Sequence, residues 1–459
     1  MGTFDSISTA LSGLSAQRQA LDVAAQNIAN ASTEGYTRQR VQMQSVGTQT
    51  VPGLWSQPAN IPGGVGVTGI VRVQDAFVDA QVRDTHAVQA ELTQNAGTLT
   101  SVESLFTEPS TTGLSSQLSG LWGAFHDVAN QPGDTGVRAA LLQKATTVTD
   151  WLNNAASSLS AQASGMTTQI GVVVTQVNST AARLAALNGS IAAVSTSGVA
   201  ANELADQRSA LATQLAQLVG GTVVTDDSGN VNVRMGGREL VSGSSAQSLT
   251  SVSAGGTTVV RWSSDGATAS VPGGQLKALV DGVTTVVPQW MARLDQVAST
   301  MASQVNALQQ SGYDLNGALG TPLFSGTTAA TISVAITDPK LIAASAVAPT
   351  AGKASLDATV AAKLGLLGAA AGSPDATYRQ MVTDLGQNVQ TANDRLTTQD
   401  AIAASADQAW QSVSGVNIDE EMTSIVSYQR AYEACGRVLT AVDSTLDTLI
   451  NHTGLVGRA

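Results

Sequence analysis

The chain has 459 residues and a formal net charge of −12, from 22 lysines and arginines against 34 aspartates and glutamates, which argues against an electrostatic nucleic-acid binder. Only 12% of the residues are charged and 3% are aromatic, so small and uncharged polar side chains dominate and favour closely packed helices over a deep catalytic pocket. The length allows roughly two to four domains, and the single cysteine, Cys435, excludes a disulfide within the chain.

The N-terminal residues predict a helix with one narrow apolar stripe. Its apolar side chains follow the a/d spacing of a heptad, and Arg18 is the one polar residue at such a position. Small polar residues and Gly35 then end the helix and begin an extended segment. The stripe consists of Phe4, Ile7, Leu11, Leu14, Leu21, Ala25 and Ile28.

The middle of the chain predicts a helical rod. Residues 41–75 are punctuated by glycine and proline, and helical spacing then covers 75–105, 114–128, 141–194 and 203–218. The helix at 141–194 would be roughly 85 Å long at about 1.5 Å per residue, with glycines at which it could bend. Further helices are expected at 274–308 and 377–412, and a strand at 331–336.

The composition changes between residues 222 and 271, where short β-branched runs alternate with turn sequences. Turns at this spacing predict an antiparallel meander of about five strands. We therefore expect a small β domain that interrupts the helical part of the chain.

The last predicted helix begins at Asn417, a favoured N-cap, and three acidic residues follow in the first turn, where the helix dipole favours anions. Its apolar stripe has the same heptad spacing as the N-terminal one, so the economical interpretation pairs the two termini as a coiled coil. The alternative is that each helix docks on an interior core. The C-terminal stripe consists of Ile425, Tyr428, Tyr432, Cys435, Leu439, Val442, Leu446 and Leu449.

These elements predict a mainly α fold with an inserted β domain. The N- and C-terminal helices form a coiled coil (1–38 with 413–459), beside a long helical-bundle rod domain (39–218 with 272–325 and 375–412). A small antiparallel β outer domain occupies 219–271. Residues 326–374 have no assigned fold, and membership of the outer domain is one alternative.

Patterns for catalysis or cofactor binding are weak. Residues 64–69 match a dinucleotide-binding glycine pattern by letter, but prolines precede it and a β-like run follows it, where a strand and a helix are needed. His86, His126 and His452 are isolated and share no ligand spacing with Cys435. We therefore expect no catalytic residues, no cofactor, no metal and no enzyme activity.

The N-terminal residues also lack the basic and apolar regions of a cleavable secretory signal. No apolar run is expected to be long enough to span a bilayer. We therefore expect a chain that does not insert into a membrane, and that is either cytoplasmic or exported without a cleaved signal.

Segments at both ends of the chain and in its interior form a recognisable set. The terminal segments are LSGL at 11–14, NIAN at 27–30, GYTR at 35–38, GVNIDEE at 415–421 and YQRAY at 428–432. The interior segments are 66–81 with Arg72, Asp75, Phe77 and Gln81, ESLF at 103–106, GLS at 113–115, Trp122 with NQP at 130–132, LADQR at 204–208, GG at 236–237 with LVSG at 240–243, and GYDLNG at 312–317. On these segments the chain resembles the bacterial flagellar axial proteins, and within them the family of hook-associated protein 1, the first of the hook–filament junction proteins.

The resemblance implies a structural subunit that forms a ring at the hook–filament junction and adapts the hook to the filament. It implies secretion through the flagellar type III apparatus. The implied partners are further copies of the chain, the hook protein, the second junction protein and an export chaperone that binds the C-terminal helix. The two heptad stripes, without Phe4 and Ala25, are then the candidate assembly interface, and whether the helices pair within or between subunits stays open.

Other functions remain as alternatives. The chain could be another flagellar axial protein, such as the hook protein or the second junction protein, since the terminal motifs are shared among them. A secreted coiled-coil adhesin would share the composition rich in serine, threonine and alanine, but it should carry a signal peptide and has no reason for matching termini.

Overall fold

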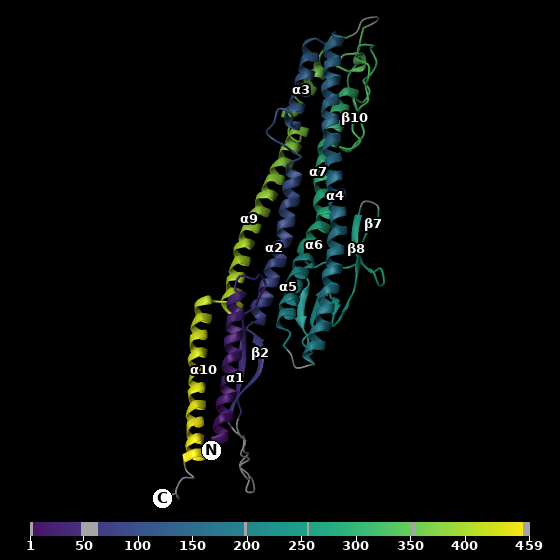
Figure 1. Ribbon diagram of the computed structural model, residues 1–459. Coiled ribbons are helices and arrows are strands. Elements are labelled where there is room, and N and C mark those ends of the chain that lie inside the picture. Colours follow the sequence, from purple (N-terminus) through teal and green to yellow (C-terminus); the bar gives the residue numbers. More distant parts are fainter. Residues whose placement is uncertain (1–2, 47–62, 197–199, 255–256, 351–354, 453–459) are drawn as a thin grey trace, which may run out of the picture.

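The computed structural model describes residues 3–46, 63–196, 200–254, 257–350 and 355–452. The molecule is elongated, and its long helices run along one main axis (Figure 1). α2 (Ala76–Glu103), α4 (Thr135–Ser195), α7 (Val287–Gln310) and α9 (Pro374–Ser414) form a rod. At one end of this rod, α1 (Thr3–Ala29) and α10 (Ile418–Asp447) lie side by side. The predicted mainly α fold with paired terminal helices is confirmed.

Shorter helices and strands complete the molecule. The helices predicted at 75–105, 114–128, 141–194, 203–218 and 377–412 are present, and the one predicted at 274–308 is divided by a π-helical turn, Gly282–Val286. The strand predicted at 331–336 is reduced to two residues. The short helices are α3 (Leu114–Asn130), α5 (Asn202–Val219), α6 (Gly274–Asp281) and α8 (Thr359–Gly365). The strands are β1 (Gln39–Val46), β2 (Gly64–Arg72), β3 (Thr222–Thr225), β4 (Val231–Met235), β5 (Arg238–Ser242), β6 (Ser245–Ala246), β7 (Leu249–Ala254), β8 (Thr257–Trp262), β9 (Phe324–Ser325) and β10 (Ser333–Val334).

α4 runs unbroken for 61 residues, or roughly 90 Å at about 1.5 Å per residue. The Asp134 carboxylate caps it by accepting from the backbone N–H groups of Gly136 (2.6 Å) and Val137 (3.4 Å). By length and composition α4 is also apolar enough to cross a membrane, contrary to the expectation that no segment is. Its buried side chains pack in the rod, against α3, α5, α6 and α7, so the core accounts for this apolar character.

The inserted strands lie along the C-terminal half of α4 (Figure 1). β3, β4, β5 and β6 form one antiparallel sheet in chain order, whereas β7 and β8 form a separate hairpin. The single meander expected from the sequence is therefore divided in two. The division lies at Leu249, whose backbone N–H and C=O are bound by the side-chain amide of Asn178 in α4, at 2.8 and 2.9 Å.

The same contact recurs at other asparagines on helices. Asn188 of α4 accepts from the N–H of Val231 (3.1 Å) and donates to the carbonyl of Val231 (2.9 Å). Asn306 of α7 binds the N–H and C=O of Phe324 at 2.9 and 2.8 Å. A side-chain amide has the donor and the acceptor of a peptide group. Each asparagine therefore replaces a neighbouring strand for one residue and attaches a strand to a helix.

Replacing Asn188 by alanine should destabilise the rod. Asn188 is 1% exposed and also binds Gly243 O (2.8 Å) and Arg208 Nη1 (3.2 Å). Leaving buried polar groups unpaired costs about 1–3 kcal/mol each, so we expect Asn188→Ala to lower the free energy of unfolding by about 2–4 kcal/mol in urea titrations. Asn154→Ala, at an exposed site of the same helix, is the control and should change it by less than about 0.5 kcal/mol. Equal effects of the two variants would contradict this assignment.

One hydrophobic core runs along the rod, and its buried members lie between Ala96 and Ala392. Its aromatic residues include Phe106 and Tyr378. The partly buried Trp151 packs against both, with ring centroids 6.2 Å from Phe106 and 6.0 Å from Tyr378. Within the described ranges, no residue of α1, β1, β2 or α10 belongs to this core. These four elements, which we call the terminal unit, therefore do not share the apolar core of the rod.

The segment without an assigned fold, 326–374, contributes to the end of the rod away from the terminal unit. Its helix α8 packs against α3 and α7. The Arg138 side chain, 1% exposed, donates to Pro132 O from Nε (3.0 Å) and Nη2 (2.7 Å), and to Ile342 O from Nη1. Burial lowers the pKa of Arg138 to about 10. This arginine thus attaches the segment to the first turn of α4.

Candidate functional site

The two terminal helices contact each other through small residues. The buried face of α1, which lies against α10 and the β1–β2 hairpin, is made almost entirely of alanine, glycine and valine. At Gly13 an added Cβ would lie only 2.9 Å from Sγ of Cys435, so the backbone of α1 closely approaches this side chain of α10. The buried apolar residues of this face are Ala10, Ala16, Ala20, Val23 and Ala24.

The structure brings the two predicted heptad stripes into one helix pair but buries none of their thirteen candidate residues fully. Leu11, Tyr432 and Leu449 are 52%, 41% and 51% exposed. The others are half-buried: Ile7, Leu14, Leu21, Ile28, Ile425, Tyr428, Cys435, Leu439, Val442 and Leu446. The alanine face of α1 was not predicted from the sequence, although its small residues recur at the helical spacing of three and four positions. The role of the stripes in assembly stays a prediction.

α10 also presents apolar side chains to solvent. Five of its large hydrophobic residues are exposed, among them Met422 at 56%. Exposed apolar side chains gathered on one helix are typical of a surface that binds another protein. The exposed members on α10 are Ile418, Met422, Val426, Tyr432 and Val438, and Leu449 is exposed in the π-helical turn that follows α10.

The close approach at Gly13 predicts a compensating pair of substitutions. Gly13→Ala should separate α1 from α10, because its Cβ would overlap Cys435 Sγ, and overpacking of this kind costs about 1–3 kcal/mol. We expect faster amide hydrogen exchange in α1 and α10 of the variant. Cys435→Ala removes the sulfur and should restore slow exchange in the double variant. Persistence of fast exchange in the double variant would contradict the contact.

Next to this helix pair, the N- and C-terminal motifs meet in a polar cluster. Asn27 accepts from the N–H of Gln39 (3.0 Å) and the hydroxyl of Tyr36 (2.9 Å), and its Nδ2 donates to Gln39 O (2.9 Å) and to Glu421 Oε2 (3.1 Å). Asn27 and Glu421 are 394 residues apart in sequence and are 1% and 3% exposed. Asn27 therefore folds the chain back after α1 and also binds α10.

Arg38 completes the cluster. Its Nε lies 2.6 Å from Glu421 Oε1, its Nη1 lies 3.0 Å from Glu420 Oε2, and its backbone N–H donates to Ser414 O (2.9 Å). The predicted N-cap is present, because Asn417 Oδ1 accepts from the N–H groups of Asp419 (3.0 Å) and Glu420 (3.4 Å). The sequence had marked these motifs by resemblance, but no local pattern predicted that they bind each other.

Burial, together with the nearby carboxylates of Asp206, Glu203 and Glu421, raises the pKa of the Tyr36 phenol to about 12. The folded chain thus holds this proton more tightly than the unfolded chain, whose tyrosine pKa is 10.0. The stability that the neutral phenol contributes is complete below about pH 10 and is lost as the pH rises through about 12.

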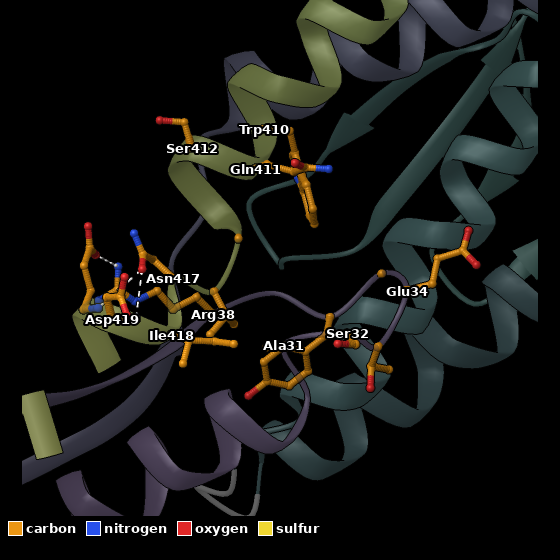
Figure 2. A pocket seen from close by; sticks show the side chains of 16 residues that line it. Ala31, Ser32, Glu34, Arg38, Trp410, Gln411, Ser412, Asn417, Ile418 and Asp419 are labelled. Carbon is orange, nitrogen blue, oxygen red and sulfur yellow. Dashed lines mark hydrogen bonds and ion pairs between the residues drawn. The ribbon is translucent and has the colours of Figure 1, made fainter. Parts of the chain in front are cut away.

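A groove with a volume of about 1030 Å³ lies beside the cluster. Figure 2 shows Trp410 and Gln411 at the end of α9 and Asn417 and Ile418 at the start of α10. It also shows Glu34, which lies on the loop between α1 and β1. The lining residues include no histidine, cysteine or lysine. Across the described ranges, no three histidine, cysteine, aspartate or glutamate side chains gather as a metal site. Residues 64–69 lie within β2 and pair with β1, so they do not form a strand-to-helix phosphate loop.

Three protein-family models match the chain. The model of the helical domain of the flagellar hook-associated protein FlgK matches residues 99–324. The model of the flagella basal body rod protein matches residues 7–37, and that of the C-terminal part of the flagellar basal body rod FlgEFG protein matches 407–452. The two outer matches contain Asn27 and Glu421, and the first ends one residue before Arg38.

Comparison with individual proteins also points to flagellar hook-associated proteins. The chain is 28% identical to flagellar hook-associated protein 1 of Bacillus subtilis, over 99% of both chains. It is 25% identical to flagellar hook-associated protein 1 of Escherichia coli, over 97% of this chain and 99% of that one. The solved structure of the flagellar hook junction protein FlgK from Burkholderia pseudomallei is similar with a TM-score of 0.65 at 17% identity, covering 73% of this chain and 100% of that one.

Proposed function

The chain belongs to the family of flagellar hook-associated protein 1, and from this premise we propose that it is a structural subunit of the bacterial flagellum that forms the ring at the hook–filament junction. In that position it adapts the hook to the filament. Membership of the flagellar axial proteins implies that it assembles with itself and with other components of the hook and filament.

The observation that carries the proposal is the arrangement of the chain ends. Two motifs from opposite ends of the sequence meet through Asn27, Arg38 and Glu421, where α1 lies beside α10. The resulting helix pair presents exposed apolar residues, such as Met422 and Val438, away from the core of the rod. Removing such a surface from water by packing against neighbouring subunits is favourable. The two heptad stripes are part of the assembly surface in this proposal.

The helical domain distinguishes the junction role from that of other axial proteins. The matches at 7–37 and 407–452 are to basal body rod models, and rod proteins would share those ends. The match at 99–324 is to a domain of the hook-associated protein and contains α3, α4, α5 and the β insert. It therefore favours the junction over the rod or the hook.

The finer parts of the proposal concern partners, export and domains. The hook protein is the partner on one side, the second junction protein is the partner on the other, and an export chaperone binds α10. The subunit has no enzymatic role and leaves the cell through the flagellar export apparatus without a cleaved signal. Its domains are the terminal helices (1–38 with 413–459), the rod (39–218 with 272–325 and 375–412) and the β insert (219–271). The separation of α1 and α10 from the core of the rod supports a terminal domain, but β1 and β2, which these bounds assign to the rod, also contribute no residue to that core.

Deleting the gene in its source bacterium tests the proposal. We expect hooks without filaments, and flagellin released into the medium, with both defects reversed by the intact gene. Immunogold labelling of flagella should place the protein at the distal end of the hook. Normal filaments on the hooks of the deletion strain would exclude the junction role.

A further inference from the structure

The terminal unit and the rod meet through a joint of polar side chains. The apolar core of the rod lies between Ala96 and Ala392, and the terminal unit buries its own alanine face. The chain crosses from one part to the other between β2 and α2, and again between α9 and α10. An interface without a shared apolar core leaves the relative orientation of two parts free unless specific polar contacts fix it.

An ion pair crosses this joint. Arg72 ends β2 in the terminal unit, and its Nε lies 2.7 Å from Oδ1 of Asp206 in α5. Both side chains are almost buried, at 11% and 10% exposed. Arg72 Nη2 also donates to Thr37 Oγ1 (3.1 Å) and to Ser209 Oγ (3.3 Å), while the N–H of Thr37 donates to Asp206 Oδ2 (3.3 Å).

Further contacts come from the same face of α5. Asn202 Nδ2 donates to Gln39 Oε1 and to Ile70 O, both at 3.0 Å. Positions 202, 206 and 209 are spaced by four and three residues, so they share one face of the helix. The first two turns of α5 thus form a platform on which the terminal unit rests.

The two charged partners lie in sequence segments that the assembly surface does not use. Arg72 belongs to the segment 66–81, and Asp206 belongs to LADQR at 204–208. Burial raises the pKa of the Asp206 carboxyl, against the opposing effects of Thr37 and Arg72. A buried ion pair adds little net stability, because desolvation offsets its attraction, but its directional contacts can select one arrangement over others.

We propose that the Arg72–Asp206 pair and the α5 platform hold the terminal unit at one angle to the rod, so that Asp206 is a positioning residue for assembly. Loss of the pair frees this angle without unfolding either part. Since all subunits of a closed ring must present their contact surfaces at the same angle, a free angle lowers the yield of rings. This last step rests on the proposed function, whereas the fixed angle does not.

The spread of angles between the terminal unit and the rod can be measured in the free subunit by double electron–electron resonance, which gives the distribution of distances between two spin labels. Exposed Gln19 of α1 and exposed Gln176 of α4 are replaced by spin-labelled cysteines, in a chain that carries Cys435→Ser. The parent should give one narrow distance distribution. We expect Asp206→Asn to give a distribution roughly twofold broader or more, because the joint has lost its directional contact. Because the unpaired Arg72 becomes solvated when the joint opens, the cost of breaking the pair falls on the joint, and the thermal midpoint of the rod should stay nearly unchanged.

Asn202→Ala is the second variant. It removes the bonds from the α5 platform to Gln39 and Ile70. We expect it to broaden the distribution as well, because the platform and the ion pair hold the angle together, so it keeps the test decisive if Asp206→Asn does not fold. Asp265→Asn is the matched control, because Asp265 forms a 2.7 Å ion pair with Arg238 in the β insert. The control should keep the narrow distribution. An unchanged distribution in folded Asp206→Asn, or in Asn202→Ala where Asp206→Asn fails to fold, would overturn the proposal.

In cells, Asp206→Asn should be exported normally but should lower the fraction of hooks that carry filaments. A broadened distribution combined with a normal number of filaments would overturn the positioning role. The distance measurement uses the free subunit, so its outcome is independent of the junction role, which the deletion strain tests separately.

Discussion

Leu439→Asp is expected to abolish filament growth while leaving the thermal midpoint of the free subunit nearly unchanged. Leu439 is half-buried on α10, within the proposed assembly surface. Packing a neighbouring subunit against it would bury an unpaired carboxylate, at a cost of several kcal/mol, roughly 3–5. The rod should not be affected, because none of the described residues of α10 belongs to its core. The measurements are filament counts by electron microscopy and thermal unfolding of the purified chain.

Thr440→Asp is the matched control for this prediction. It adds the same charge at the next position of α10, where the side chain is exposed. We expect it to support substantially more filament growth than Leu439→Asp. Export of both variants must be measured in the medium, because α10 is also the proposed binding site of the chaperone. Full filaments with exported Leu439→Asp would show that this stripe is not the assembly surface. A large fall in the thermal midpoint would instead place Leu439 in an internal core.

Glu421→Ala should unfold the terminal unit locally while the rod remains folded. Glu421 is 3% exposed, and its carboxylate binds Arg38 at 2.6 Å and Asn27 at 3.1 Å. Removing one partner of a buried ion pair costs about 3–5 kcal/mol, and we expect about 2–4 kcal/mol here because Arg38 keeps Glu420 and is partly exposed. Hydrogen exchange should accelerate in α1 and α10, and it should remain slow in α4 and α7.

Glu420→Ala separates the effect of burial from that of charge. Glu420 contacts the same arginine at 3.0 Å, but its side chain is 58% exposed. An exposed ion pair contributes about 0–1 kcal/mol, so this variant should exchange nearly as slowly as the parent. Similar acceleration in both variants would mean that the buried cluster does not hold the terminal unit together.

The helices of the rod could be predicted because their signals are local. Apolar spacing predicted the course of α4, and Asn417 predicted the start of α10 through its capping side chain. The β insert was located by its turns, but its division into two sheets depends on Asn178, which is distant in sequence from Leu249. A side chain that replaces a strand partner leaves no periodic pattern in the sequence, so this division could not be predicted.

The terminal site could be predicted only in part, for a related reason. Heptad spacing identified both helices and their larger apolar residues, such as Leu14 and Leu439. On an alanine-rich helix, however, a neighbouring stripe of small residues has the same spacing, and small side chains allow the closer approach seen at Gly13. Periodicity alone cannot show which stripe faces the partner helix. The contacts of Asn27 and Arg38 with Glu421 depend on the whole fold between them.

The distance in sequence between Asn27 and Glu421 also sets an order of events. During synthesis α1 is made first, because the chain grows from its N-terminus. Glu421, whose carboxylate binds Asn27, follows 394 residues later. Contacts between such distant residues form late, because the intervening chain must first be brought together. A chain that stops before Glu421 cannot close the cluster. The polar cluster that joins the two terminal helices can therefore form only once the chain has been made through Glu421.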